Sequence, residues 1–270
     1  MSALSDSDAT PLAAQRRHAI LEQIQAHGAV RVRELVRALG VSDMTVRRDL
    51  EALARRGLVH KVHGGATAVQ PHTTDEPGFL AKSTRHEREK ELIAARAAQL
   101  VAPGTAVAVS AGTTTWRLAR RLVEVADLTV VTNSIPVAEV FAHAPREDRT
   151  VILTGGIRTR SDALVGPLAV AAVRSLNVDQ VFLGVHGMSA ATGYTSPNFL
   201  EAETDRALLD AARQRILLAD HTKWDTVGLA TICPLAEAHV LVTDAGLGHD
   251  ARSLLQGEVG ELVVVEDAAG

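Results

Sequence analysis

The stretch that decides the fold of the N-terminal region is residues 41–56, VSDMTVRRDLEALARR. Ser42 is a favourable N-cap residue, because its hydroxyl can accept a hydrogen bond from a backbone N–H in the first turn of a helix. Val41 and Val46 occupy the N′ and N4 positions, where two apolar side chains form a hydrophobic staple. Gly57 follows, and glycine adopts the left-handed conformation that ends helices. The pattern predicts a helix over this whole stretch.

The two faces of this predicted helix differ in character. Val46, Leu50 and Leu53 have the i, i+4, i+7 spacing of one helix face, and we expect them to be buried. The side chains that point away from this face are Met44, Thr45, Arg48 and Ala52, with Arg47 on the flank. Thr45 and Arg48 can therefore reach base edges in a DNA major groove, where arginine on guanine is the commonest specific contact. The flanking arginine can reach either a base or a phosphate.

The elements around this helix complete the order of a winged helix-turn-helix. Residues 14–27 and 32–39 carry apolar residues at helical spacing, and Gly40 ends the second run. Residues 58–62 have the pattern of a short strand, and the His63-Gly64-Gly65 turn follows, its glycines letting the wing approach DNA closely. Arg55, Arg56, Lys61 and His63 are placed for phosphate contacts. The predicted DNA-binding residues are Ser42, Thr45, Arg47, Arg48, Arg55, Lys61, His63 and Gly64.

The charge distribution agrees with a DNA-binding head. The whole chain has a net charge of −4, but residues 12–66 hold ten Lys or Arg against five Asp or Glu, a net charge of +5. The remaining residues hold 18 basic against 27 acidic residues, a net charge of −9. A basic module on an acidic body confines phosphate attraction to that module. Solvated arginines on an amphipathic helix are the alternative, but they do not explain the cap, the staple and the wing together.

A regular alternation of strands and helices begins after residue 84. The strand-like runs are 106–110, 128–132, 150–154, 180–185, 215–220, 239–243 and 261–265, and helical segments lie near 115–124, 136–143, 167–175, 200–212 and 248–255. This pattern predicts a Rossmann-like α/β domain with a largely parallel sheet. The predicted organisation is a disordered tail at 1–12, a winged helix-turn-helix at 13–67, a linker at 68–84 and the α/β domain at 85–267.

Three of the predicted strands end in small polar residues. A glycine at the start of a helix lets a phosphate approach its backbone N–H groups, and ligands bind at the carboxyl ends of parallel strands. The turn residues predicted to bind a ligand are Gly112, Thr113, Thr114, Thr115, Thr132, Asn133, Ser134, Gly155 and Gly156. The same residue types are ordinary turn formers. No lysine follows Gly112 as in a Walker A motif, so nucleotide hydrolysis is not expected. Lys223, after another strand, is either a phosphate ligand or a solvated loop residue.

The ordered series of motifs resembles the DeoR family of bacterial repressors. The matching motifs are VSDMTVRRDL at 41–50, Gly57-Leu58, HGGA at 63–66, Glu87 with Lys90, Gly112-Thr113-Thr114, TVVTNS at 129–134, TGG at 154–156, Gly166-Pro167, Asn177-Val178-Asp179, Glu201-Ala202, and Ala219-Asp220 with Lys223. The resemblance implies a repressor of a sugar or polyol catabolic operon, relieved by a phosphorylated sugar. It implies a sensor domain similar to ribose-5-phosphate isomerase, and it raises Asp179 and Lys223 as effector-binding residues.

Three positions depart from the family pattern. Many members of the family have an acidic residue where Ser110 stands, an Asp-Gly where this chain has His186-Gly187, and a basic residue where Asp205 stands. The missing carboxylates remove partners for sugar hydroxyls, so the effector can differ from the usual ones. His186, His221 and His239 lack the spacing of metal ligands, and we expect no metal, cofactor or catalytic residue.

Two other classes of function remain open. The first is a sugar-phosphate isomerase-like enzyme that carries a DNA-binding module, although no carboxylate pair for proton transfer is evident near the polar turns. The second is a DNA-bending architectural protein, which has no need of a large acidic α/β body. The expected partners are double-stranded operator DNA, a phosphorylated sugar or polyol, and further copies of the chain in a dimer or tetramer, because one helix-turn-helix reads one half-site. A single Cys233 and the lack of a signal-peptide pattern or membrane span predict a cytoplasmic location.

Overall fold

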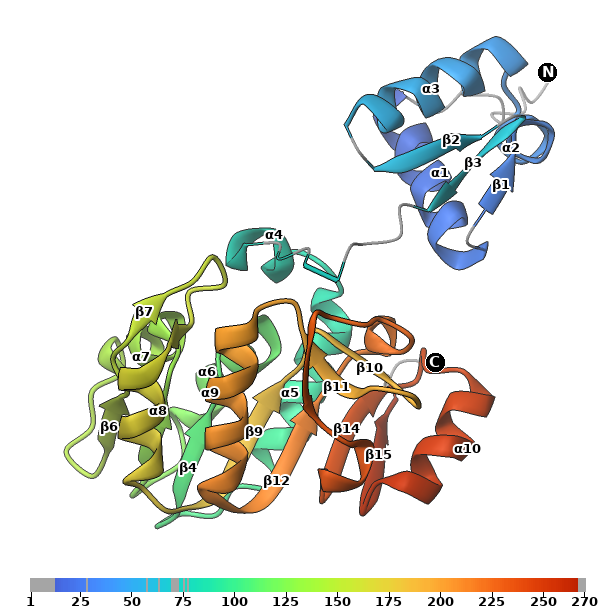
Figure 1. Cartoon of the computed structure of the whole chain (residues 1–270). Helices are drawn as coiled ribbons and strands as arrows, with labels where there is room; N and C mark the ends of the chain where they lie inside the picture. The colour runs from blue at the N-terminus through green and yellow to red at the C-terminus, as the bar shows by residue number, and fades with distance from the viewer. Residues whose placement is uncertain are drawn as a thin grey trace, which may run out of the picture. The chain divides into compact units, whose positions relative to one another are not determined.

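The computed structural model describes residues 13–27, 29–56, 58–62, 64–68, 73–74, 76 and 78–266. The chain divides into two compact units, one within residues 1–71 and one within residues 72–270 (Figure 1). The predicted tail at 1–12, the helix stop at Gly57 and the wing residue His63 lie outside the described residues. Among the helices of the described ranges, none combines the length and the apolar character needed to cross a membrane.

The described part of the first unit consists of three helices and a small antiparallel sheet. Its elements are α1 (Ala13–His27), β1 (Ala29–Arg31), α2 (Val32–Leu39), α3 (Asp43–Arg55), β2 (Val59–Val62) and β3 (Gly65–Ala68). The strands pair in the order β1-β3-β2. Val46, Leu50 and Leu53 of α3 are at most 1% exposed, so the predicted buried face is confirmed. Val41 packs against the same core, as expected of the staple residue.

An ion pair in this unit ties α1 to α3. Asp49 is buried on α3, and its Oδ2 accepts a hydrogen bond of 2.6 Å from Nε of Arg16, which is also buried. Arg17 lies 3.5 Å from the other carboxylate oxygen. Two of the basic residues of the head are therefore directed at an acidic residue of α3. The predicted apolar stripe accounts for only part of the contact between the two helices.

The second unit is built around a parallel sheet of seven strands. Its strands are β4 (Ala106–Val109), β5 (Thr129–Thr132), β6 (Thr150–Leu153), β9 (Val178–Gly184), β12 (Ala212–Leu218), β14 (Val240–Asp244) and β15 (Glu261–Val265). They lie in the order β15-β14-β12-β9-β4-β5-β6, and every neighbouring pair is parallel. The chain runs outward from β4 to one edge and then from β9 to the other. The strand order therefore reverses between β4 and β9, which is a topological switch point.

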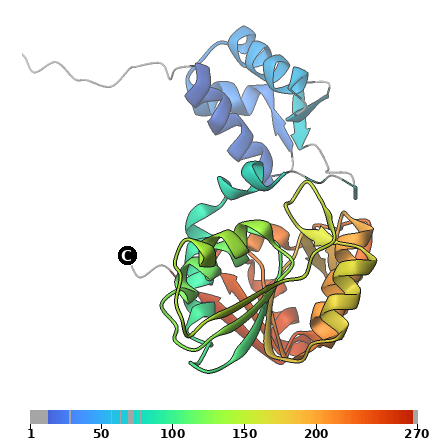
Figure 2. The ribbon, with the colours of Figure 1, turned by 90° about the vertical axis from the view of Figure 1, so that its left-hand side faces the viewer.

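Helices cover both faces of this sheet (Figure 2). On one face α5 (Glu87–Ala98), α6 (Thr113–Leu122) and α7 (Ile135–Ala142) pack on Val107 and Phe182. On the other face α8 (Pro167–Arg174), α9 (Phe199–Asp210) and α10 (His249–Glu258) pack on Ala108 and Leu183. Adjacent strand residues point to opposite faces, so each strand contributes to both cores. This alternation explains why the strands appear in the sequence as short continuous apolar runs.

Several short elements were not expected from the sequence. A hairpin is formed by β7 (Ile157–Arg158) and β8 (Leu164–Val165), and a three-stranded sheet by β10 (Gly187–Ser189), β11 (Gly193–Ser196) and β13 (Ala230–Cys233). Short 3₁₀ turns are η1 (His221–Lys223) and η2 (Leu235–Glu237). Within the segment predicted as a linker, α4 (Phe79–Ser83) belongs to the second unit, where Phe79 meets Trp116 edge-to-face at 5.9 Å.

The buried ion pair between α1 and α3 makes a stability prediction. We expect Asp49→Ala to lower the free energy of unfolding of the first unit by about 3–5 kcal/mol, because it removes the buried carboxylate that faces the buried Arg16 guanidinium. Chemical denaturation of the full chain, followed by circular dichroism, measures the change. Asp43→Ala on the exposed side of the same helix is the control and should stay close to the unmodified chain. Equal effects of the two substitutions would contradict the assignment.

Candidate functional site

The start of α3 is fixed by its own polar residues. Ser42 Oγ accepts a hydrogen bond of 3.2 Å from the backbone N–H of Thr45, as predicted for an N-cap. The two hydroxyls, of Ser42 and Thr45, also lie 2.9 Å apart. Both side chains thus have partners within the helix start, so their first role is to hold the N-terminus of α3 in shape.

The two arginines of α3 differ in their surroundings. Nε of Arg47 donates to Asp43 Oδ1, and its Nη2 lies 3.4 Å from Asp43 Oδ2, so Arg47 is held by an i, i+4 ion pair. Arg48 is exposed and has no hydrogen bond or ion pair with any other described residue. Met44, one helical turn before it, is 63% exposed. Of the two predicted arginines, Arg48 is therefore the one available to a base without breaking an internal contact.

The wing carries exposed basic and glycine residues. Arg55 ends α3, Lys61 lies on β2, and both are exposed. Gly64 has a positive φ of 79° at the turn between β2 and β3, and its carbonyl accepts from Val32 N–H at 2.9 Å. From the sequence we expect Gly65 to let the wing approach DNA closely, but the structure gives a different reason for a glycine at this position. Gly65 is buried, and a Cβ atom there would lie 2.1 Å from the carbonyl oxygen of Val30, so its glycine serves strand pairing.

The carboxyl ends of β4 and β9 meet at the switch point of the larger sheet. Ser110 is fully buried there and its Oγ accepts from Gly184 N–H at 3.0 Å. The next strand joins through Asn133, whose Oδ1 accepts from Ala111 N–H at 2.9 Å. The first two predicted turns are therefore brought together. The Ser110 hydroxyl therefore fastens β4 to β9.

The polar residues after β5 are mainly structural. Thr132 Oγ1 donates to the carbonyl of Val109 at 2.6 Å, and Ser134 Oγ accepts from Val137 N–H and caps α7. Asn133 Nδ2 donates to the carbonyl of Leu164 at 3.3 Å. All three predicted residues thus hold backbone segments around the edge. Their hydroxyl and amide groups shape the site more than they offer free ligand atoms.

The start of α6 has no side-chain cap. Gly112 is its N-cap and contributes no side-chain cap. The hydroxyls of Thr113 and Thr114 make no hydrogen bond within the described ranges, whereas Thr115 Oγ1 donates to the Gly112 carbonyl at 3.0 Å. Backbone N–H groups at a helix start carry partial positive charge and bind phosphate. An anion site at this turn therefore stays a prediction, which the lack of a side-chain cap at Gly112 supports.

The third predicted turn leads into the β7–β8 hairpin. Gly156 has φ of 122°, and a Cβ atom there would lie 2.5 Å from the carbonyl oxygen of Val165. Gly155 has φ of 71° with no heavy atom close to its missing Cβ. The requirement for glycine at 156 comes from the close approach of the two hairpin strands, so it needs no ligand to explain it.

Basic groups gather beside the carboxyl end of β12. Asp220 follows this strand with no exposed surface, and its Oδ2 has no hydrogen-bond partner within the described ranges and lies 3.9 Å from Nζ of Lys223. Lys90, on α5, is 3% exposed, and its Nζ donates to the carbonyls of Lys82 and Arg85 at 2.7 and 2.6 Å. Burial lowers the pKa of Lys90 to about 8, helped by the nearby positive charges, while Asp220 opposes the shift.

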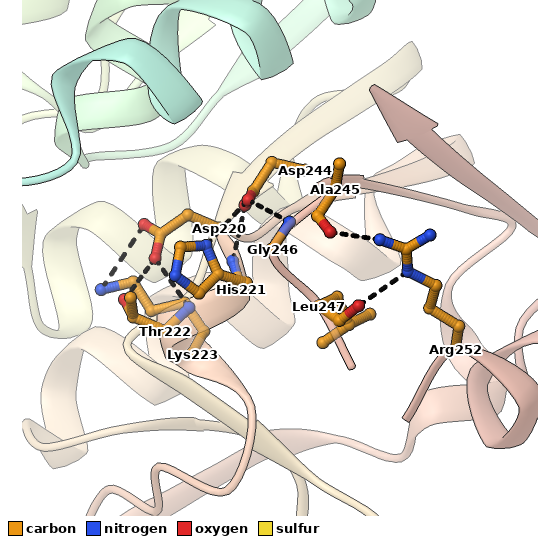
Figure 3. Close-up of polar contacts among 9 residues, drawn as sticks. All are labelled: Asp220, His221, Thr222, Lys223, Asp244, Ala245, Gly246, Leu247 and Arg252. Atoms are coloured by element: carbon orange, nitrogen blue, oxygen red, sulfur yellow. Dashed lines mark hydrogen bonds and ion pairs between the residues drawn. The ribbon is translucent and has the colours of Figure 1, made fainter. Parts of the chain in front are cut away.

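A histidine and an aspartate occupy the neighbouring strand end (Figure 3). Nδ1 of His221 lies 2.7 Å from Oδ2 of Asp244, the last residue of β14. The hydrogen bond to Asp244 is the main cause that raises the pKa of His221. Asp244 itself has a lowered pKa, because the hydrogen bonds from His221 and Gly246 outweigh its burial. The imidazole is therefore biased toward its protonated form.

A second polar cluster surrounds Glu201 on α9. Its Oε1 accepts from the hydroxyls of Ser161 and Thr159, the latter at 2.7 Å, and both come from the β7–β8 hairpin. Burial raises the pKa of Glu201, and the hydrogen bonds from these two hydroxyls oppose the shift. Lys82 is close enough for its charge to favour the ionised carboxylate, while burial lowers its own pKa. Asp205, one turn further along α9, is buried with a pKa well above its usual range for the same reason.

Asp179 is not brought to this edge. It lies at the amino end of β9, and its Oδ2 accepts from Ala106 N–H at 2.9 Å at the start of β4. A strand rises about 3.3 Å per residue, so the length of β9 separates Asp179 from the switch point. Its carboxylate has a structural partner there, and we leave it out of the candidate effector site.

Sequence reasoning missed Lys90, His221 and Asp244 as site residues. Lys90 shares a helical face with Ile93, Ala94 and Ala97, which are all buried. A lysine on the core-facing stripe of a helix is unusual and could have identified it. No comparable signal exists for the other two, because they are 23 residues apart in sequence and meet only through the pairing of β12 with β14.

Comparison with known proteins connects both units to one family. Residues 16–72 match the DeoR-like helix-turn-helix domain, and residues 85–245 match the DeoR C terminal sensor domain. YgbI of Escherichia coli (strain K12), an uncharacterized HTH-type transcriptional regulator, is 36% identical over 92% of this chain and 97% of that protein. The glycerol-3-phosphate regulon repressor of the same organism is 31% identical over 86% of this chain and 90% of its own length.

Among solved structures, a D-ribose-5-phosphate isomerase in complex with phospho-erythronic acid is similar to this chain. The similarity covers 51% of this chain and 54% of that chain, with a TM-score of 0.39 and 14% sequence identity. A likeness this distant says nothing about the ligand of the present protein.

The free guanidinium on α3 leads to a prediction about DNA recognition. We expect Arg48→Ala to weaken specific DNA binding by roughly 1–3 kcal/mol, because it removes a side chain placed to contact a base edge. Arg47→Ala is the matched comparison and should cost less, since Arg47 must first leave Asp43. Fluorescence anisotropy on a selected target DNA and on scrambled DNA measures both. If Arg48→Ala weakens both DNAs equally, Arg48 contacts phosphate and the base-reading assignment is wrong.

Proposed function

The chain belongs to the DeoR family of transcriptional regulators, and we propose that it represses a sugar or polyol catabolic operon until a phosphorylated sugar or polyol binds its α/β unit. The observation that carries the proposal is the set of cationic and anion-binding groups at the carboxyl edge of the sheet. This set comprises the open start of α6 and the ammonium groups of Lys90 and Lys223. An effector phosphate is the charge that these groups would match.

The family membership supports a role in DNA binding for the first unit. Its third helix exposes Arg48 and Met44 beside a capped N-terminus, which is the end of a recognition helix that contacts base edges. We propose that two copies of the chain act together, because one helix-turn-helix per chain reads one half-site. A dimer or tetramer in the cytoplasm is the form expected to bind the operator.

An enzyme that carries a DNA-binding module is the weaker alternative. Relatives matched over nearly their full length are named as regulators or repressors. The buried acids near the edge, Glu201 and Asp205, lie one helical turn apart, and burial raises the pKa of both. Burial thus shifts both carboxyl groups in the same direction, whereas an acid and a base that exchange protons in catalysis need environments that push their pKa values apart. Measurable turnover of ribose 5-phosphate by the purified chain would contradict the proposal.

The proposal is tested on operator DNA obtained by selecting binding sites from a random pool. The complex is challenged with a panel of sugar phosphates and polyol phosphates, and with the corresponding unphosphorylated compounds. We expect at least one phosphorylated compound to release the DNA and its unphosphorylated counterpart to have no effect. A complex that no member of the panel changes would overturn the effector assignment.

Lys223 provides a test of the phosphate site. Lys223→Met keeps much of the side-chain volume and removes the charge, so we expect it to weaken effector binding by about 1.5–3 kcal/mol, the range for a hydrogen bond to a charged group. Isothermal titration calorimetry with the active compound measures the loss. Lys61→Met is the matched control, because it removes a lysine from the wing and should lower DNA affinity while sparing the effector. Unchanged effector affinity in Lys223→Met would remove this residue from the site.

Lys90 makes the effector affinity depend on pH. Its pKa lies at about 8, so its ammonium is present at lower pH and is lost as the pH rises through that value. An effector phosphate stays dianionic above its second pKa of about 6, so it does not itself titrate in this range. We therefore expect effector affinity to fall between about pH 7.5 and 9. The fall should be shallower in Lys90→Met, and identical pH profiles for both proteins would contradict the role of Lys90.

A further inference from the structure

The imidazole of His221 is clamped from one side by Asp244. The buried carboxylate accepts the His221 backbone N–H at 2.7 Å through Oδ1, while its Oδ2 contacts Nδ1 at 2.7 Å and accepts Gly246 N–H at 2.9 Å. The imidazole lies between Asp244 and the Asp220 side chain (Figure 3). With Nδ1–H bound to a carboxylate, the chemistry left to the ring resides in Nε2.

Packing holds the ring in this orientation. A Cβ atom at position 246 would lie 2.5 Å from Nδ1 of His221, so the glycine lets the backbone close over the ring. The ring of His86, from the start of α5, meets the His221 ring edge-to-face with centroids 5.7 Å apart. Nε2 has no hydrogen-bond partner within the described part of the chain, and 31% of the side chain is exposed. Asp244 therefore anchors Nδ1, and Nε2 stays available to a ligand.

The charges around His221 come from three elements. β14 contributes Asp244, the turn after β12 contributes Asp220 and Lys223, and the start of α5 contributes His86 and Glu89. The carboxylates favour the protonated imidazole. The charge of Lys90 also interacts electrostatically with Asp220, so Lys90 belongs to the same cluster. The imidazole thus belongs to the group of cations at the carboxyl edge.

A purely structural role for the imidazole explains less of this arrangement. The turn after β12 is already held by backbone donors, because His221 N–H donates to Asp244 and Thr222 N–H donates to Asp220 at 3.1 Å. If the side chain only stabilised this turn, the hydrogen bond between Nδ1 and Asp244 would be sufficient. Such a role would not require a partly exposed ring whose Nε2 has no hydrogen-bond partner in the described ranges.

We propose that His221 is a further effector-binding residue, in which Asp244 orients the ring so that Nε2–H donates to an anionic oxygen of the effector held beside Lys223. The proposal rests on the proposed function, since the effector is the phosphorylated compound argued for above. A protonated ring binds a dianionic phosphate more strongly than a neutral one. The hydrogen bond that Nδ1–H of His221 donates to Asp244 raises the pKa of His221, so this contribution is present at lower pH and is lost as the pH rises through that raised value.

Two amide substitutions separate the two nitrogens. His221→Asn places an amide near Nδ1, where it can still donate to Asp244, but it has no group at Nε2. His221→Gln places its amide nitrogen near Nε2. We expect the concentration of effector that releases half of the DNA to rise about tenfold or more in His221→Asn, and to rise much less in His221→Gln. A His221→Asn protein that responds like the unmodified chain would overturn the proposal.

The matched control is His249→Asn, because the side chain of His249 is 93% exposed on α10. It should respond to the effector like the unmodified chain. DNA affinity without effector is measured for every variant to report on folding. If His221→Asn fails to fold, the His221→Gln protein and the following titration decide the question.

Inorganic phosphate is the direct probe of the ring in the full-length chain. The ¹³Cε1 resonance of His221, assigned by its absence from His221→Gln, is titrated with pH in the presence and absence of phosphate. We expect phosphate to raise the pKa of this imidazole, and an unmoved titration curve would overturn the proposal. A raised pKa together with DNA that no sugar phosphate releases would support the anion contact while rejecting the proposed repressor function.

Discussion

The reversal of strand order between β4 and β9 is the constraint on which the second unit depends. The helices that follow these two strands, α6 and α9, lie on opposite faces of the sheet, which is the arrangement in which parallel α/β sheets bind ligands at the carboxyl ends of their strands. Ser110 joins the two strand ends by accepting Gly184 N–H, and Asn133 connects the next strand to them by accepting Ala111 N–H. The cations at Lys90 and Lys223 lie at the same edge because α5 and the β12 turn are attached to the same sheet.

Much of this organisation was predictable from the chain itself. The seven strands of the large sheet are apolar runs in the sequence, and helices separate most of them. The buried face of α3 is evident from the i, i+4, i+7 spacing of Val46, Leu50 and Leu53. The open start of α6 follows from Gly112 and the threonines after it. These features depend on residues close together in sequence. The local pattern is then sufficient to place them.

Other features depend on contacts between distant residues. The strands β7 and β8 are two residues long and have no period to detect. Asp49 has the appearance of a solvated helix residue, and only the approach of Arg16, 33 positions earlier, makes it a buried ion. Asp179 is only five residues before Gly184, the last residue of β9, but it lies at the amino end of the strand. An extended strand separates its two ends by about 3.3 Å per residue, so Asp179 is far from the carboxyl ends where the candidate site lies. Resemblance could suggest that residue as a ligand, and only the topology could place it.

The ion pairs of the first unit affect how strongly its affinity for DNA depends on salt concentration. Arg16 and Arg17 face Asp49, and Arg47 faces Asp43, so part of the positive charge of the head is already neutralised inside the protein. Each phosphate contact releases condensed counterions and steepens the dependence of affinity on salt by about 0.9 on a logarithmic scale. A head with fewer free cations releases fewer counterions. We therefore expect its affinity for DNA to depend less steeply on salt concentration than it would if all ten of its basic residues were free to contact phosphates.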